Sequence, residues 1–350
     1  MVLLAVCICL GLIVPGVWAS LEDFAPGADY RLPYLLSDDY WLFTRWCKYA
    51  SGNYEIVLVG DSVVWGQYVA PNGTLSHHLN RIAGRDLFAN LGVDGLHPAA
   101  LAGLVERYGD ALDGRGIILH LNPMWMSSDR HDLRRGEQNR LNHPRLLPQF
   151  DRGLVGDRES LAGRLGIVCE RSVDILGLVS HVKTVYFEDL DIQSWTMESP
   201  YRNPLGAITF RVPAPDNRPK SRPVSWYDRR IGQEDLPWPS PESSSQWQAF
   251  KRVVEKLGER GNEVLVLVGP YNPHVLTGES RHRYIAARGT MEAWLEDNGV
   301  SYHTIADLPS EWYADASHPL EAGYGEIARS LSRSEVFGSW MDTVEKGKLR

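Results

Sequence analysis

The chain has 350 residues, of which 43% are hydrophobic and 23% are charged, which is the composition of a globular protein with an extensive core. Its formal net charge is −8, and it contains no long basic block, so a protein that tracks nucleic-acid phosphates is excluded as a function class. Only one apolar run is long enough to reach across a bilayer, which excludes a polytopic membrane protein.

The amino-terminal residues are continuously apolar from Val2 to Val14, and a Pro-Gly pair and small residues up to Ala19 follow. This order resembles a secretory signal peptide that is cleaved after Ala19, although no Lys or Arg precedes the apolar core. Counted to Ala19, the run is also just long enough for an uncleaved membrane anchor. We therefore predict export to a periplasmic or extracellular location, with residues 1–19 as a signal peptide or as an N-terminal membrane anchor.

Short β-rich runs alternate with longer helical patterns along the chain. The β-rich runs predict strands at residues 55–60, 86–90, 116–122, 184–188, 263–269 and 301–305. The helical patterns between them predict helices at residues 74–83, 98–108, 158–181, 246–260, 280–298 and 319–331. Runs that are apolar on both faces are typical of a parallel sheet with helices on both sides. The sequence therefore predicts an α/β fold, a three-layer α/β/α sandwich around a mainly parallel, flavodoxin-like sheet.

Residues 191–246 depart from this alternation. They contain nine of the 21 prolines together with Trp195, Trp226 and Trp238. Proline at this density opposes regular structure, whereas the tryptophans oppose simple disorder. We predict an ordered insertion whose tryptophans cover apolar surface, with stacking on sugar rings as the alternative. The remaining divisions that we expect are an N-terminal extension at 20–54, a main domain at 55–335 and a C-terminal tail at 336–350.

Two of the four cysteines, Cys47 and Cys169, lie outside the apolar leader. In an oxidising compartment they could form one disulfide. The alternative is two separately buried thiols. The spacing of the cysteines does not match a zinc site, and we predict no metal site.

Four polar segments fall at the predicted strand ends or in the loops that follow. Gly60-Asp61-Ser62 comes after the first strand, residues 90–95 come after the second, and Asn122 ends the third. The fourth segment is Asp315-Ala316-Ser317-His318, directly before the last predicted helix. Each segment alone is most simply explained as a turn or a helix cap. Together they supply a nucleophile, a base, an orienting carboxylate and oxyanion donors at one edge of one sheet.

These segments together resemble the sequence blocks of the SGNH hydrolase superfamily, the GDSL-like esterases and lipases. The resemblance spans roughly residues 55–331, so the main domain would be SGNH hydrolase-like. Carried over by position, it implies Ser62 as the nucleophile, His318 as the general base and Asp315 as the partner that orients His318. It also implies an oxyanion hole made of the backbone N–H groups of Ser62 and Gly95 and the side-chain amide of Asn122.

The chain departs from the family pattern at two places. Val63 replaces the usual Leu after the serine, which is a minor apolar exchange. The third block normally has the pattern Gly-x-Asn-Asp, whereas here it is His120-Leu121-Asn122-Pro123. The second departure bears on how the Asn122 donor is placed.

The resemblance implies a serine esterase that cleaves an O-acyl ester through an acyl-enzyme and needs no metal or organic cofactor. The substrate would be a small-molecule or glycan ester, and removal of acetyl groups from a glycan is one form of this activity. Two alternatives stay open. The first is an O-acetyltransferase acting on an extracellular polysaccharide, in which a sugar hydroxyl replaces water. The second is a non-catalytic binding protein that keeps the SGNH fold.

Overall fold

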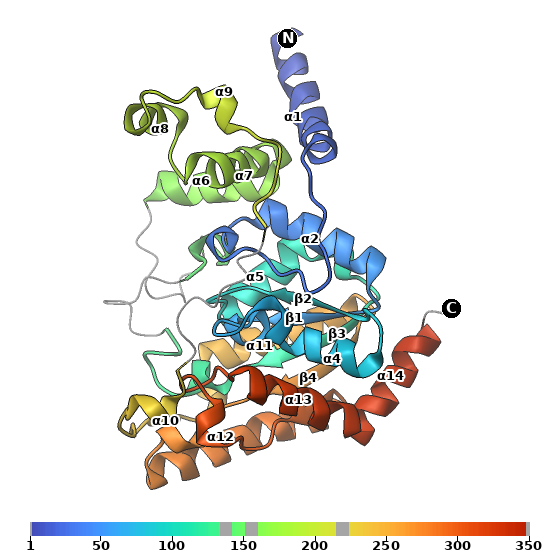
Figure 1. Cartoon of the computed structure of the whole chain (residues 1–350), viewed down its shortest axis with the longest axis vertical. Helices are drawn as coiled ribbons and strands as arrows, with labels where there is room; N and C mark the ends of the chain where they lie inside the picture. The colour runs from blue at the N-terminus through green and yellow to red at the C-terminus, as the bar shows by residue number, and fades with distance from the viewer. Residues whose placement is uncertain (1, 134–141, 151–159, 215–223, 348–350) are drawn as a thin grey trace.

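The computed structural model describes residues 2–133, 142–150, 160–214 and 224–347, with side chains described from residue 11 onward. Its centre is a five-stranded sheet in the order β2-β1-β3-β4-β5 (Figure 1). All neighbouring strands in this sheet are parallel. The strands are β1 (Ile56–Gly60), β2 (Phe88–Gly92), β3 (Gly116–Leu121), β4 (Glu263–Val268) and β5 (Ser301–Thr304). This order and direction confirm the predicted flavodoxin-like sheet.

Alternate residues of each strand face two separate cores, because side chains alternate across a strand. In β1, Val57 and Val59 face one core, while Ile56 and Leu58 face the other. The first core is covered by α2 (Tyr40–Asn53), α5 (Pro98–Tyr108), α11 (Ser245–Glu259) and α12 (Gly278–Asp297). The second is covered by α4 (Leu75–Ala83), α13 (Glu321–Arg333) and α14 (Glu335–Gly347). The predicted three-layer α/β/α arrangement is therefore confirmed.

The strand predicted at residues 184–188 is wrong. Residues 184–187 form the last turn of helix α7 (Asp174–Phe187), and Glu188 is its C-cap. Strand propensity depends strongly on packing context. Here Tyr186 is buried against Trp18 of helix α1 (Val2–Leu21), and Phe187 against Trp195 of helix α8 (Ile192–Glu198). Extending an existing helix fixes only one residue for each new hydrogen bond, so the upstream turns favour helix at this site.

The single helix predicted at residues 158–181 is two helices in the structure. They are α6 (Leu161–Ser172) and α7, and Val173 between them has the extended backbone angles φ −133° and ψ 104°. Both belong to a group with α8 (Ile192–Glu198) and α9 (Pro204–Ala207) that stands away from the sheet beside α1 (Figure 1).

The insertion at 191–246 is ordered where the structure describes it. Besides α8 and α9 it contains α10 (Trp226–Arg229). Trp195 is buried against Phe187, and Trp238 is buried against Tyr271 and Tyr284. These two tryptophans cover apolar surface, as predicted. Residues 215–223 of the insertion lie outside the described part of the chain.

Both ends of the chain are helical. The predicted leader is part of α1 (Val2–Leu21). Among the residues that the structure describes, no helix is both long and apolar enough to cross a membrane. At the other end, the segment treated as a tail includes most of α14, whose Phe337, Trp340 and Val344 are buried in the second core.

Neither prediction for the two cysteines holds in full. Cys47 and Cys169 are both free, so the disulfide alternative is wrong. Cys47 is buried on α2, whereas Cys169 is exposed on α6. Burial raises the pKa of the Cys47 thiol well above its ordinary value, which makes this thiol inert.

Candidate active site

Ser62 lies where the chain leaves β1 at its carboxyl end. It is the first residue of the short helix α3 (Ser62–Trp65), and the Asp61 carboxylate caps this helix by accepting the N–H of Val63 at 3.0 Å. β1 and β3 are neighbours, but the chain continues from β1 to an outer strand on one side and from β3 to outer strands on the other. Ligands of open α/β sheets bind at such a reversal, so Ser62 occupies a favourable position for chemistry.

The three predicted catalytic side chains lie together. The Ser62 Oγ is 2.8 Å from the His318 Nε2, although 256 residues separate them in the chain. The His318 Nδ1 is 2.8 and 2.9 Å from the two carboxylate oxygens of Asp315. Ser62 and His318 are each only 8% exposed. In this geometry the His318 Nε2 can accept the Ser62 hydroxyl proton, and Asp315 keeps the imidazole oriented.

The electrostatics of the pair are mutual. Burial by itself raises the pKa of Asp315, but the charge and hydrogen bond of His318 and two backbone N–H groups lower it to about 2. Burial by itself lowers the pKa of His318, but the Asp315 charge and hydrogen bond outweigh burial, and the pKa is raised. Asp315 is therefore ionised near neutral pH and stabilises a protonated His318.

Local hydrogen bonds fix the loop that carries the pair. The Asp315 Oδ1 accepts the backbone N–H groups of Ser317 and His318 at 3.0 Å each. The Asn272 N–H, in the loop after β4, donates to the Ala316 carbonyl at 2.8 Å. Thus the loop after β4 supports the loop before α13.

Helix α13 also contacts the nucleophile turn, by which we mean the short helix α3 that begins with Ser62, the proposed nucleophile. The buried Tyr324 hydroxyl donates to the Val63 carbonyl at 2.6 Å. On the other side of the turn, the buried Arg31 guanidinium donates to the carbonyls of Trp65 and Gly66 at 2.7 and 2.6 Å. The N-terminal extension and the last part of the fold therefore hold the same four-residue helix.

The predicted oxyanion donors differ in how the structure places them. Asn122 follows β3, and its side-chain Nδ2 donates to the Asp61 Oδ2 at 2.7 Å, next to Ser62. Gly95 lies in the turn after β2 with φ +73°, a backbone conformation that favours glycine. The N–H groups of Ser62 and Gly95 have no acceptor among the described residues. No described contact joins Gly95 to the three predicted catalytic residues.

Three nearby residues were not predicted. His120, which is 1% exposed in its side chain, places its Nδ1 3.0 Å from the Asp61 Oδ1. The Tyr68 ring meets the His318 ring edge to face at 5.4 Å. Arg229 on α10 lies 5.8 Å from the centre of the Tyr68 ring, so the insertion reaches the site. Of the three, only His120 had a signal in the sequence, since it stands where the family pattern has glycine. The contacts of Tyr68 and Arg229 depend on how distant segments pack, so no local pattern could have found them.

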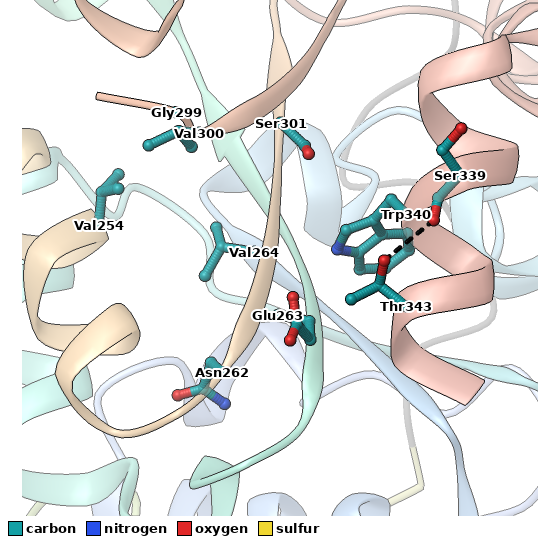
Figure 2. Close-up of a pocket in the computed structure, with 10 residues that line it drawn as sticks. All are labelled: Val254, Asn262, Glu263, Val264, Gly299, Val300, Ser301, Ser339, Trp340 and Thr343. Carbon is teal, nitrogen blue, oxygen red and sulfur yellow. Dashed lines mark hydrogen bonds between the residues drawn. The ribbon is translucent and has the colours of Figure 1, made fainter. Parts of the chain in front are cut away.

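Other polar features lie elsewhere. A cavity of about 290 Å³ is lined by Glu263, Ser301 and Trp340, among others (Figure 2). Glu263 and Ser301 begin β4 and β5, so this cavity is at the opposite edge of the sheet from Ser62. Within the described parts of the chain, no cluster of three His, Cys, Asp or Glu side chains could hold a metal ion.

The sheet places the candidate site residues at its carboxyl end. They are a serine after β1, an asparagine after the neighbouring β3, and an Asp-x-x-His loop before α13. The fold is a flavodoxin-like three-layer α/β/α sandwich. Solved structures with similarity to this chain include a G-D-S-L family protein from Desulfitobacterium hafniense DCB-2, with 10% identity and a TM-score of 0.37. That match covers 80% of this chain and 99% of the other.

A carbohydrate acetylesterase family member from Sinorhizobium meliloti matches with 13% identity and a TM-score of 0.35, over 81% of this chain and 99% of the other. No protein-family model and no curated protein sequence matches the chain. Function therefore has to be inferred from the chain's own residues.

Proposed function

We propose that the protein is a serine hydrolase that cleaves an O-acyl ester of a small molecule or a glycan. The observation that carries the proposal is the contact of the Ser62 Oγ with the His318 Nε2 at 2.8 Å, while the His318 Nδ1 contacts Asp315. A serine hydroxyl is a weak nucleophile until an adjacent base accepts its proton. His318 is placed to be that base, and Asp315 fixes the ring so that the Nε2 faces the serine.

In the proposed reaction the Ser62 Oγ attacks the ester carbonyl carbon as the His318 Nε2 takes the hydroxyl proton. The carbonyl π electrons move to the oxygen, which becomes the oxyanion of a tetrahedral intermediate. The C–O bond to the alcohol then breaks, and His318 returns the proton to the leaving oxygen. Water then attacks the acyl carbon while His318 takes its proton. The bond to the Ser62 Oγ breaks, His318 returns the proton to that oxygen, and the carboxylic acid leaves.

The developing oxyanion would be stabilised by the N–H groups of Ser62 and Gly95 and by the Asn122 amide. Asn122 has an amide N–H left for this purpose, because its Nδ2 has one described acceptor, Asp61. The loss of one such donor costs up to about 4 kcal/mol of transition-state stabilisation.

The test is turnover of p-nitrophenyl acetate, butyrate and octanoate by the full chain, together with labelling by a fluorophosphonate. We expect the wild type to hydrolyse at least one ester and to be labelled, and Ser62→Ala to do neither. Ser172→Ala removes a serine hydroxyl from the exposed surface of α6 and should behave as wild type. Absence of both turnover and labelling in the wild type would contradict the proposal and favour the non-catalytic alternative.

A second arm of the same assay separates hydrolysis from acyl transfer. Oligosaccharide acceptors are added, and both free acid and acylated sugar are measured. Hydrolysis predicts that the rate of acid release does not depend on the acceptor. Faster formation of acylated sugar than of free acid would identify the transferase instead.

We also propose that the chain is exported, with residues 1–19 as a signal peptide or an anchor. The support is the apolar run from Val2 onward. Cell fractionation and mass measurement of the mature amino terminus test this: a cytosolic protein with an intact leader would contradict it.

A further inference from the structure

The imidazole of His120 is enclosed beneath the carboxyl edge of the sheet. Its Nε2 lies 2.7 Å from the carbonyl oxygen of Gly269, in the loop after β4. Its Nδ1 lies 3.0 Å from the Asp61 Oδ1. A carbonyl oxygen and an ionised carboxylate can only accept hydrogen bonds. The Nδ1 is not aligned with Asp61 for a hydrogen bond, but an unprotonated Nδ1 would turn its lone pair toward a carboxylate oxygen only 3.0 Å away. The contact therefore favours a proton on each ring nitrogen and an ion pair of His120 with Asp61.

The backbone of β1 makes room for this imidazole. A Cβ at Gly60 would lie 2.6 Å from the His120 Cβ and 2.7 Å from the Val64 side chain. Real Cβ contacts essentially never occur at such distances. The glycine that precedes Asp61 is thus required for His120 to reach the carboxylate.

The Asp61 carboxylate is the link between His120 and the proposed oxyanion donor. Burial alone would raise the pKa of Asp61, but the charge of the adjacent His120 and the hydrogen bond from Asn122 hold it at about 2. The Asp61 Oδ2 accepts the Asn122 Nδ2 at 2.7 Å and the Trp125 Nε1 at 3.3 Å.

The Asn122 amide is held at both ends. Its Oδ1 accepts the N–H of Met124 at 3.1 Å, and its Nδ2 donates one hydrogen to Asp61. These two bonds determine which end of the amide is the donor and leave the second Nδ2 hydrogen in a fixed direction. A preorganised donor of this kind is what stabilises an oxyanion without reorganisation.

We propose that His120 is a positioning residue: as an imidazolium it holds Asp61, and Asp61 in turn orients the Asn122 amide toward the oxyanion. The inference rests on the proposed hydrolase function. It also explains how an ionised carboxylate can lie beside a developing negative charge, since the imidazolium offsets the carboxylate charge. Without His120, the buried Asp61 would oppose the oxyanion, and it would lose one of the groups that fix its position.

The test is a double-mutant cycle on His120 and Asn122, measured as kcat and KM for the best ester. We expect His120→Gln to lower kcat about 10- to 100-fold by misplacing the donor, with KM within about twofold. We expect Asn122→Ala to lower kcat about 10²- to 10³-fold. Because most of the effect of His120 passes through Asn122, the loss of kcat in the double variant should be clearly smaller than the product of the two single losses. Losses that multiply, or a His120→Gln variant as fast as wild type, would overturn the inference.

The matched control is His303→Gln on β5, where the ring Nε2 lies 3.3 Å from the Ser330 Oγ. This variant should keep the wild-type kcat. Thermal unfolding of each variant separates a loss of fold from a loss of donor placement.

A measurement that does not depend on turnover is the ¹⁵N-histidine NMR spectrum of the wild type, with the His120 signals assigned by through-space contacts within the wild-type protein. We expect two ring N–H protons for His120 at pH 7, and one ring proton only would overturn the inference even if His120→Gln does not fold. Failure of the proposed function looks different, because the wild type would then turn over no ester.

Discussion

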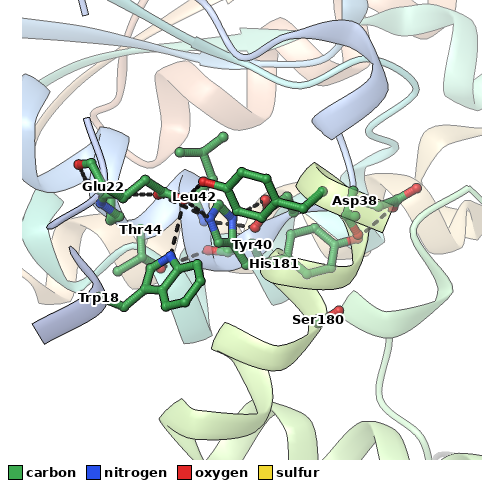
Figure 3. Close-up of polar contacts among 12 residues, drawn as sticks. Trp18, Glu22, Asp38, Tyr40, Leu42, Thr44, Ser180 and His181 are labelled. Atoms are coloured by element: carbon green, nitrogen blue, oxygen red, sulfur yellow. Dashed lines mark hydrogen bonds and ion pairs between the residues drawn. The ribbon is translucent and has the colours of Figure 1, made fainter. Parts of the chain in front are cut away.

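Two buried histidines in this protein are both held by carboxylates, but only one is arranged for chemistry. His318 contacts Asp315 through its Nδ1 and the Ser62 hydroxyl through its Nε2. His181 contacts Asp39 through its Nδ1 at 2.6 Å. Its Nε2 lies 2.9 Å from Glu22, and both residues are labelled in Figure 3. The difference lies in the second nitrogen, which faces a hydroxyl in one case and a carboxylate in the other.

The surroundings of His181 complete its role as a structural group. Glu22 also accepts hydrogen bonds from Tyr186, Trp18 and Arg45, so its charge is fully compensated. The network joins the end of α1 to α2 and α7. His181, with its pKa raised to about 9, has no nitrogen left to accept a proton from a substrate. A histidine suited to catalysis keeps one ring nitrogen available to exchange a proton. In a structural histidine such as His181, both ring nitrogens are already paired with carboxylates.

The largest expected effects come from neutralising one carboxylate beside each histidine. Asp315→Asn should lower kcat about 10⁴-fold, because the ring loses its orienting partner. Asp39→Asn should leave kcat within about twofold and lower the free energy of unfolding by about 3–5 kcal/mol, because it breaks a buried ion pair. Ester turnover and urea unfolding of both variants check this, and an Asp39→Asn protein that is stable but slow would contradict it.

The pH dependence of stability sharpens the comparison further. The pKa of His181 rises from 6.5 to about 9 on folding, so its stabilisation is complete below pH 6.5 and is lost as the pH rises through about 9. The loss is roughly 3 kcal/mol. We expect the difference in unfolding free energy between wild type and His181→Gln to shrink by that amount between pH 6 and pH 9.5. A difference that does not change with pH would show that His181 is not charged in the fold.

The pH dependence of activity should report His318 instead. In the proposed mechanism its neutral form is the base, and its pKa is raised above the ordinary 6.5 by Asp315. We therefore expect kcat/KM to fall tenfold per pH unit on the acid side, with the midpoint above pH 6.5. Asp315→Asn should move the residual activity profile to lower pH, whereas Asp39→Asn should not move it. Profiles measured between pH 5 and 9 decide between these outcomes.

The smallest expected effects come from two tyrosine hydroxyls. Tyr186 donates to the Glu22 carboxylate, and Tyr324 donates to the Val63 carbonyl in the nucleophile turn. Tyr186→Phe should cost about 1.5–3 kcal/mol of stability because its acceptor is charged, and Tyr324→Phe about 0.5–1.5 kcal/mol. Only Tyr324→Phe should also lower kcat. Equal effects of the two variants on kcat would remove the distinction between the two regions.

Much of the fold follows from local patterns. The strands at β1, β3, β4 and β5 were predicted within one or two residues, because a run that is apolar on both faces has few alternatives in a soluble protein. The segment at 184–188 was wrong because its β-branched and aromatic residues are equally suited to the buried side of α7, and local composition does not distinguish the two. Cys47 and Cys169 could not be assigned because their separation depends on how α2 and α6 pack.

The sequence by itself determined which residues could do the chemistry: a serine after a buried strand, and an aspartate three residues before a histidine ahead of the last helix. Tertiary structure alone decided that these segments meet, because the parallel crossovers bring Ser62 to the same end of the sheet as His318, which is 256 residues away. It also decided the role of His120 and of His181. A histidine's function depends on which atoms face its two nitrogens. For His120 and His181 those atoms come from segments far away in the chain.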